Sequence, residues 1–230
     1  MSIYIAGETL DLVTCPNTDS FYEEWASWFN NKLITKDIHQ GSIPHSASSQ
    51  RSFYEQESPH RLILFLQPKG LDKPVGVCSL SNICSEQRRS DFAMIIGDRS
   101  GYRDSLFIGF EAKALMTQYA FKYLPIDRIN SSQSINLIKW QKYQILLGYF
   151  SEGISFNSFV KNNIAYDEVL SSALRDNVQS IIDSRGGHLW PGKSRFLALM
   201  RTLPEVSMPE QLLISIKQLN KEFLPYAIQL

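Results

Sequence analysis

The stretch from Phe92 to Tyr123 has the residue order of an anion-binding site. An apolar run, Phe92-Ala93-Met94-Ile95-Ile96, ends at Gly97-Asp98, a polar loop follows, and Gly109 is expected to open a helix. The N–H groups in the first turn of a helix have no partner within the helix, and the helix dipole is positive there. A strand that leads through a loop into a helix N-terminus therefore predicts a place to hold a phosphate.

Carboxylates and histidines near this stretch are candidates for proton transfer. Asp91 precedes the apolar run and Glu152 follows Gly148-Tyr149-Phe150, and either carboxylate can deprotonate an ammonium group through a water. A long polar segment, residues 32 to 60, carries histidines that can act as bases near neutral pH. These histidines are His39, His45 and His60. An ion pair for each carboxylate and an exposed loop position for each histidine are the alternative interpretations.

Motifs of several other chemistries are absent from the sequence. It contains no Gly-x-Ser-x-Gly elbow, no Gly-x-x-x-x-Gly-Lys-Ser/Thr loop and no His-Glu-x-x-His helix. Pro191-Gly192-Lys193-Ser194 ends like a phosphate loop but lacks the upstream glycine and strand, so we expect a turn there. Three cysteines without paired spacing predict reduced thiols and no metal site. They are Cys15, Cys78 and Cys84.

The composition is that of a globular protein with no net charge. Lys+Arg and Asp+Glu both total 23, and this zero net charge gives no support for a nucleic-acid or membrane-surface binder. No window approaches the roughly 20 apolar residues of a membrane span. The N-terminus lacks the basic and apolar regions of a signal peptide, so we expect a cytoplasmic protein. With 43% hydrophobic residues the chain can bury a sizeable core.

Periodicity and turn signals predict a mixture of strands and helices, in which three consecutive strands joined by short turns form an antiparallel meander. Ser20-Phe21-Tyr22-Glu23 is typical of a capping box at a helix start. Apolar patterning predicts a helix from Phe110 to Tyr123, and Asn136 is expected to cap another that ends at Gly148. Strands are expected at residues 9–13, 61–67, 75–83, 91–96, 126–131, 149–153 and 164–171.

The C-terminal part is expected to be helical. Ser194 can cap a short helix, and Pro209 suits the first turn of a second one. The second helix would carry one apolar stripe, which must be covered by this domain, another subunit or a partner. The stripe consists of Leu212, Ile216, Leu219 and Phe223.

The order of these elements resembles that of the GNAT acyl-CoA N-acetyltransferases. Trp28-Phe29-Asn30-Asn31, Gly148-Tyr149-Phe150 with Glu152-Gly153, and Tyr166-Asp167 resemble motifs of the branch that includes ribosomal-protein alanine and aminosugar acetyltransferases. The resemblance implies an α+β fold with a mixed, mostly antiparallel sheet flanked by helices. It implies one such domain over residues 1–176, and residues 177–230 would form a helical extension.

The resemblance also implies which residues bind acetyl-CoA and which act on the acceptor. The backbone of Met94, Ile95 and Ile96 would face acetyl-CoA, and Asn136 would contact its pantetheine arm. The pyrophosphate would lie on Arg103, Leu106, Phe107, Ile108, Gly109 and Phe110. Tyr143 would protonate the departing thiolate, with Asp91 or Glu152 as the base. Residues 32 to 60 would cover the acceptor, with Trp28 and His45 binding it.

The proposed phosphate loop departs from the family pattern Arg/Gln-x-x-Gly-x-Gly/Ala. With its last glycine at Gly109, Asp104 replaces the basic or amide residue and Phe107 replaces the middle glycine. Arg99 and Arg103 can offset the added negative charge. Tyr143 lies five residues before Gly148, one more than usual, and a helical bulge would absorb the difference.

The sequence thus predicts acetyl-CoA-dependent N-acetylation of a primary amine by direct transfer. The acceptor would be an aminosugar nucleotide, another small amine or a protein N-terminus. The alternative is a non-catalytic GNAT-like module that acts as an assembly component, with the C-terminal helix binding a second copy or a partner protein. The glycine-poor loop is the feature that favours this alternative.

Overall fold

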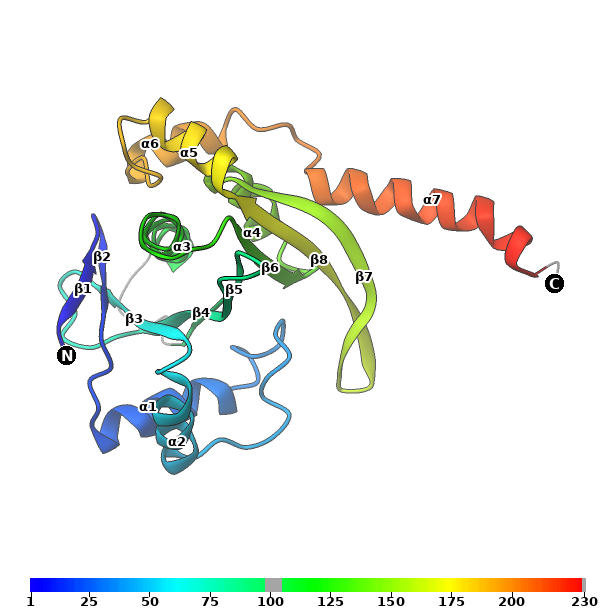
Figure 1. Cartoon of the computed structure of the whole chain (residues 1–230). Coiled ribbons are helices and arrows are strands. Elements are labelled where there is room, and N and C mark those ends of the chain that lie inside the picture. Colours follow the sequence, from blue (N-terminus) through cyan, green and yellow to red (C-terminus); the bar gives the residue numbers. More distant parts are fainter. Residues whose placement is uncertain (98–104, 229–230) are drawn as a thin grey trace.

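The computed structural model describes residues 1–97 and 105–228 (Figure 1). The strands of this part form one eight-stranded sheet in the order β1-β2-β3-β4-β5-β6-β8-β7. Within it only β5 and β6 pair in parallel. The predicted α+β class with a mixed, mostly antiparallel sheet is confirmed.

Most of the expected strands and helices are present, and the strand Ile3–Ala6 and the helix Ala47–Glu57 are additional to the prediction. The strands are β1 Ile3–Ala6, β2 Leu10–Val13, β3 Leu62–Pro68, β4 Gly76–Cys84, β5 Arg89–Ile96, β6 Arg128–Ser134, β7 Tyr149–Lys161 and β8 Ile164–Leu174. The helices are α1 Asp19–Asn30, α2 Ala47–Glu57, α3 Ser105–Tyr123, α4 Ile138–Tyr143, the 3-10 helix η1 Gln144–Leu147, α5 Arg175–Ser184, α6 Lys193–Met200 and α7 Met208–Ile228. Within the described residues, no helix is both long and apolar enough to cross a membrane.

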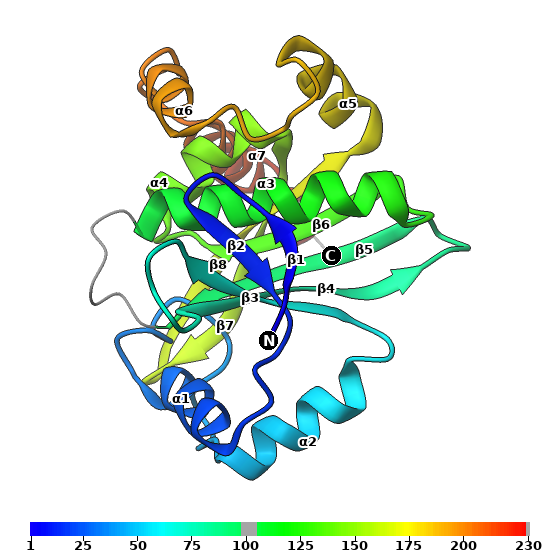
Figure 2. The ribbon, with the colours of Figure 1, turned by 90° about the vertical axis from the view of Figure 1, so that its left-hand side faces the viewer.

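Helices cover both faces of the sheet. Helices α1 and α2 lie on one face, and α3 with α4, α5 and α6 lies on the other (Figure 2). The larger hydrophobic core fills the α3 face, and a smaller aromatic core under α1 contains Phe21, Trp25 and Phe65. The sheet therefore separates two packed layers. Successive side chains along a strand point alternately into one layer and the other.

Two helices on the α1 face differ from the sequence prediction. The N-cap of α1 is Thr18, whose hydroxyl accepts from the N–H of Phe21, so the predicted capping box from Ser20 is wrong. Helix α2 was not predicted, because its own apolar pattern is weak. It begins after Ser46, whose side chain and that of Ser49 cap each other's backbone N–H groups. Local capping thus forms a helix in a segment that composition describes as a loop.

Helix α3 begins at Ser105, four residues before Gly109, the residue expected to open it. Gly109 therefore lies in its second turn and does not open the helix. A Cβ at Gly109 would lie 3.0 Å from Trp140, 3.2 Å from Met94 and 3.3 Å from Ile96. The glycine permits close packing of α3 on β5 and α4, which is a structural reason for its presence.

The segment after β6 also differs in detail. Leu137, not Asn136, occupies the N-cap position of α4, without a side-chain hydrogen bond, so the capping prediction for Asn136 is wrong. Where the sequence analysis expected a helical bulge, the α-helix ends at Tyr143 and the 3-10 helix η1 continues from Gln144 to Leu147. Gly148 has φ 81°, as predicted for a left-handed residue that ends a helix.

Residues 185–200 belong to the main core. Leu189 and Phe196 are fully buried and Trp190 is 8% exposed, and all three pack in the core cluster of the α3 face. The N-cap of α6 is Gly192 without a side-chain bond, so the predicted cap at Ser194 is wrong. The boundary at residues 176 and 177 stays a prediction.

Helix α7 projects away from the body of the molecule (Figure 1). Pro209 lies in its first turn, as predicted. Leu212 and Ile216 are half-buried, whereas Leu219 is 51% and Phe223 is 65% exposed. The exposed fraction of the predicted stripe therefore increases toward the C-terminal half of the helix.

Candidate functional site

Strands β5 and β6 separate at the centre of the sheet. They pair over Arg89, Ser90 and Asp91, and the last pair joins Asp91 to Asn130. Beyond it β5 continues to Ile96 and β6 to Ser134 without pairing to each other. This split leaves one edge of β5 open in the middle of a continuous sheet.

The open edge presents backbone hydrogen-bonding groups. The N–H of Gly97 donates to the carbonyl of Val75, the residue just before β4 begins, and the carbonyl of Ile95 lies close to Gly76. Because successive residues of a strand point their backbone groups to opposite sides, Met94 and Ile96 direct theirs into the split. The prediction that Met94 and Ile96 present backbone there fits this geometry. Ile95 faces β4, so that prediction is wrong for Ile95.

The first turn of α3 follows residues 98–104, which lie outside the part of the chain that the structure describes. Leu106 and Phe107 are half-buried in this turn, and their N–H groups precede the first intrahelical bonds. Ile108 and Phe110 are buried, and the N–H groups of Gly109 and Phe110 belong to the helical ladder. An anion can therefore reach only the first part of the predicted set. Arg103 and Asp104 lie outside the described residues.

Helix α4 places Tyr143 beside α3. The Tyr143 ring is half-buried and meets Phe110 edge-on, with 6.4 Å between ring centroids. Trp140, one turn earlier, stacks on Phe110 at 4.4 Å. Asn136 is exposed before the helix, and its backbone N–H donates to the Ser134 hydroxyl at 3.3 Å. The roles of Tyr143 and Asn136 toward acetyl-CoA stay predictions.

A lysine that the sequence analysis missed lies beneath the apex of the split. Lys113 of α3 is fully buried, and its Nζ donates to Ser131 Oγ at 3.1 Å and to Gln144 Oε1 at 2.8 Å. It also lies 3.6 Å from the centre of the Tyr149 ring and 5.2 Å from that of Phe92. Phe92 and Ser131 each follow the last paired residue of β5 and β6, so the amine lies where the strands diverge.

Burial sets the protonation of this lysine. Loss of water around Nζ lowers the pKa of Lys113 well below its ordinary value. Gln144 is held in turn by Gln133 Oε1 at 2.9 Å and Ser171 Oγ at 3.0 Å. The helical apolar pattern around Ala112 and Met116 is the signal that could have placed Lys113 at a buried position.

The two predicted carboxylate bases lie on the α1 face of the sheet and are already bonded. Asp91 accepts from Asn82 Nδ2 at 2.7 Å and from Asn130 Nδ2 at 2.8 Å. Glu152 forms an ion pair with Arg128 and accepts from Ser172 Oγ at 2.6 Å. The Arg128 guanidinium lowers the pKa of Glu152. A carboxylate held in this way is a weak base, which favours the ion-pair interpretation for Glu152.

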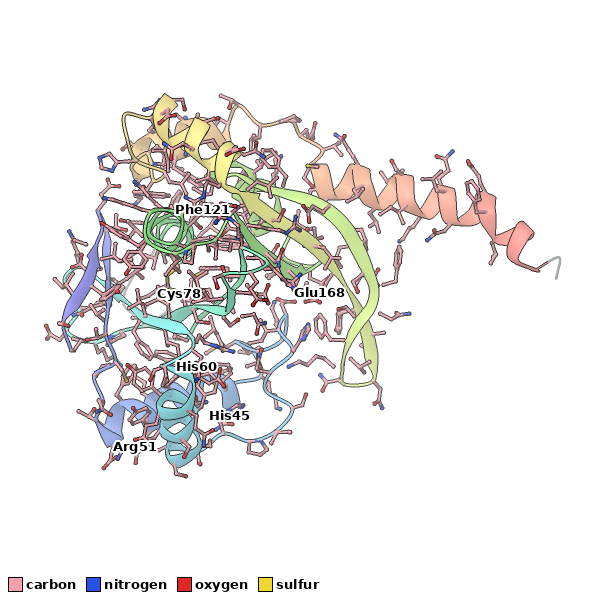
Figure 3. All side chains as sticks on the ribbon, in the orientation of Figure 1. His45, Arg51, His60, Cys78, Phe121 and Glu168 are labelled. Carbon is pink, nitrogen blue, oxygen red and sulfur yellow. The ribbon has the colours of Figure 1, made fainter. Side chains whose placement is uncertain are left out.

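The predicted acceptor-side residues serve the packing of α1. Trp28 is 3% exposed and covers Gly97, where a Cβ would lie 2.1 Å from the indole. This burial assigns Trp28 to the core, in contrast to its predicted contact with substrate. The His45 ring stacks on Phe29 at 4.9 Å and its Nδ1 lies 2.9 Å from Gln50 Nε2. Burial lowers the pKa of His45, which stabilises the neutral ring. Figure 3 shows His45 beside α1 and α2, and Glu168 at the sheet.

Solved structures share this fold, although no protein-family model and no curated protein matches the sequence. Spermidine N-acetyltransferase from Vibrio cholerae, in complex with CoA and spermine, is 15% identical over 75% of this chain and 99% of that one, with a TM-score of 0.65. An acetyltransferase (GNAT family) from Bacillus anthracis is 15% identical over 75% and 98%, with a TM-score of 0.60. Microcin C7 self immunity acetyltransferase MccE, in complex with acetyl-CoA and AMP, is 20% identical over 73% and 93%, with a TM-score of 0.58. The chain therefore has the fold of the GNAT acetyltransferases.

Proposed function

We propose that this chain is a cytoplasmic acetyl-CoA-dependent N-acetyltransferase that acts on a primary amine by direct transfer. The observation that carries the proposal is the split between β5 and β6, with the unpaired backbone of Met94 and Ile96 on its edge. An extended amide-containing arm can bond to such an edge as an added strand does. Neighbours of the same fold were solved with acetyl-CoA or CoA. The amine is an aminosugar nucleotide, another small amine or a protein N-terminus.

The proposed reaction divides its tasks among elements around the split. Acetyl-CoA supplies the acetyl group as a thioester, which an unprotonated amine can attack. Met94 and Ile96 hold the arm, and the first turn of α3 at Leu106 and Phe107 holds the pyrophosphate, with Arg103 added from the loop. Tyr143 donates a proton to the departing thiolate. The acceptor enters from the α1 face, opposite α3.

A charge placed in the first turn of α3 tests the phosphate site. Ser105→Glu puts a carboxylate there, which suits the helix dipole but repels a pyrophosphate. We expect Ser105→Glu to bind acetyl-CoA at least tenfold more weakly than the matched control Ser105→Gln, about 1.4 kcal/mol. Calorimetric titration measures both. Equal affinities would place the phosphate elsewhere. Gly109→Val is a poorer test, because its side chain would collide with Trp140.

Removal of one hydroxyl tests the proposed acid. Tyr143→Phe keeps the edge-on packing against Phe110 and loses only the donor. General acid catalysis is typically worth about 100-fold or more, so we expect kcat to fall by that factor with little change in acetyl-CoA affinity. Thiol release in the steady state gives kcat, and Tyr123→Phe, at an exposed position of α3, is the control. Unchanged turnover when chemistry limits the rate would make Tyr143 a packing residue.

A non-catalytic assembly module is the second candidate. The observation that favours it is the projecting half of α7, where Leu219 and Phe223 are exposed. This face would bind a second copy or a partner protein. A thermal shift separates the candidates, because acetyl-CoA at 100 times its Kd would stabilise an acetyltransferase by roughly 2.7 kcal/mol.

A further inference from the structure

His39 and Glu168 form a dyad on the acceptor side of the sheet. His39 lies in the segment between α1 and α2, and its Nε2 is 2.9 Å from Glu168 Oε1 on β8. The second carboxylate oxygen of Glu168 accepts from Ser158 Oγ at 2.5 Å. The Glu168 side chain is 8% exposed, whereas that of His39 is 53% exposed. One partner is thus buried and fixed, and the other is open to solvent.

The register of the sheet places the dyad at the open end of the split. Glu168 pairs with Ser134, the last residue of β6, where β5 and β6 have diverged. Val169, Ser171 and Ala173 of β8 point into the α3 layer, so Glu168 has the opposite parity and faces the α1 layer. The dyad therefore lies on the face from which the acceptor would enter.

The bond to Glu168 fixes which nitrogen of His39 can accept a proton. An ionised carboxylate only accepts hydrogen bonds, so Nε2 carries the hydrogen in the neutral ring. Nδ1 is then the basic nitrogen, and it accepts no hydrogen bond from the part of the chain that the structure describes. The ring is held by contact with Phe159, at 5.0 Å between centroids, and Phe159 stacks on Tyr166.

We propose that His39 is the general base that deprotonates the acceptor amine, with Glu168 as its positioning residue. This inference rests on the proposed function. An ammonium group gives one proton to Nδ1, and the resulting imidazolium is stabilised by the Glu168 carboxylate. The free amine then forms the bond to the acetyl carbon as the C–S bond breaks. Tyr143 donates its proton to the departing sulfur and takes up the second proton that the amine nitrogen loses. The proton on His39 returns to water.

The structure favours this base over the two carboxylates predicted from the sequence. Asp91 already accepts from two side-chain amides, and Glu152 is paired with Arg128, which lowers the pKa of its carboxyl. His39 instead has a carboxylate on Nε2 only, so Nδ1 of its solvent-exposed ring is open to an incoming ammonium group. The charged group in contact with His39 is Glu168 on β8, and its own segment also carries the ion pair of Lys36 with Asp37. Lys161 Nζ donates to the carbonyl of Thr35 at 3.0 Å and also to that of Gln40, which ties the segment to the β7–β8 hairpin.

Kinetics of His39→Gln test the inference, with His60→Gln as the matched control at an exposed position outside the dyad. The probes are acetyl-CoA with glucosamine and with an alanine-first peptide, and CoA release is followed by a thiol reagent. We expect kcat/KM for the amine to fall about 100-fold at pH 7 in His39→Gln, with acetyl-CoA affinity unchanged within about twofold. The loss should shrink as pH rises, because more of the amine is then unprotonated. Thermal melts confirm folding.

A second measurement reports on the dyad without activity. Long-range nitrogen NMR of the neutral wild-type ring should show the hydrogen on Nε2, and Glu168→Gln should weaken that preference. A hydrogen on Nδ1, or equal pH profiles for His39→Gln and His60→Gln in an active enzyme, would overturn the inference alone. A wild type that binds no acetyl-CoA and acetylates neither probe would overturn the proposed function, and the assignment of the base with it.

Discussion

A chain that ends after Asp183 is expected not to fold. The deletion removes Leu189, Trp190 and Phe196 from the main core, where none is more than 8% exposed. Burial of such side chains stabilises by roughly 1.5–3 kcal/mol each, and domains are stable by only about 5–15 kcal/mol. The deletion also uncovers Phe110, which packs on Phe196 at 5.1 Å. Thermal melts and light scattering on purified chains measure the loss.

A chain that ends after Leu203 is the control for this deletion. It loses α7, with the half-buried Leu212 and Ile216, but keeps α6 and the buried cluster, so we expect it to fold with a modest loss of melting temperature. If the exposed half of α7 joins two copies of the chain, the full chain is a dimer and this control is a monomer. Equal melting temperatures for the full chain and the chain ending at Asp183 would mean that Leu189, Trp190 and Phe196 do not pack in the main core.

The fold could be predicted from the sequence where pattern and turn chemistry agree. Strands β3, β4 and β5 are apolar runs between turn residues, and Gly148 and Pro209 end or begin helices by backbone geometry that few other residues adopt. Helix α2 has no apolar stripe, and only the mutual caps of Ser46 and Ser49 define its start. Such caps are common in loops as well, so composition alone predicts a loop there.

The site was predicted less well, because its residues depend on pairing between distant segments. Asp91 and Glu152 were candidates by position along the chain, yet Asn130 and Arg128 on β6 decide their chemistry. His39 is one of several polar-segment histidines until β8 brings Glu168 to it. The split begins where β5 stops pairing with β6, after Asp91 and Asn130. No local sequence pattern predicts this pairing between distant strands.

Lys113 is the clearest case of a residue that tertiary contacts redefine. A lysine in an amphipathic helix pattern is ordinarily solvated, but here its Nζ lies among Phe92, Trp140 and Tyr149 with Ser131 and Gln144 as acceptors. The chain therefore folds around an amine whose charged form is disfavoured. The free energy of unfolding therefore depends on pH through Lys113.

Stability of the wild type relative to Lys113→Met is expected to rise steeply with pH. Burial lowers the pKa of Lys113 in the folded chain, whereas an unfolded lysine has a pKa near 10.4. Between these two values the unfolded state binds the extra proton, so each pH unit adds up to about 1.4 kcal/mol to the free energy of unfolding. The wild type thus loses stability as pH falls through this window, and Lys113→Met does not.

Urea denaturation from pH 7 to pH 10 measures the difference between the two chains. Other titrating groups are common to both and cancel. Toward pH 10 the wild type should be the more stable chain, because methionine leaves Gln144 Oε1 without its donor, a loss of about 1–3 kcal/mol for a buried acceptor. Lys122→Met, at an exposed position of the same helix, is the matched control. A Lys113→Met difference as flat with pH as that control would mean that the buried amine keeps its proton.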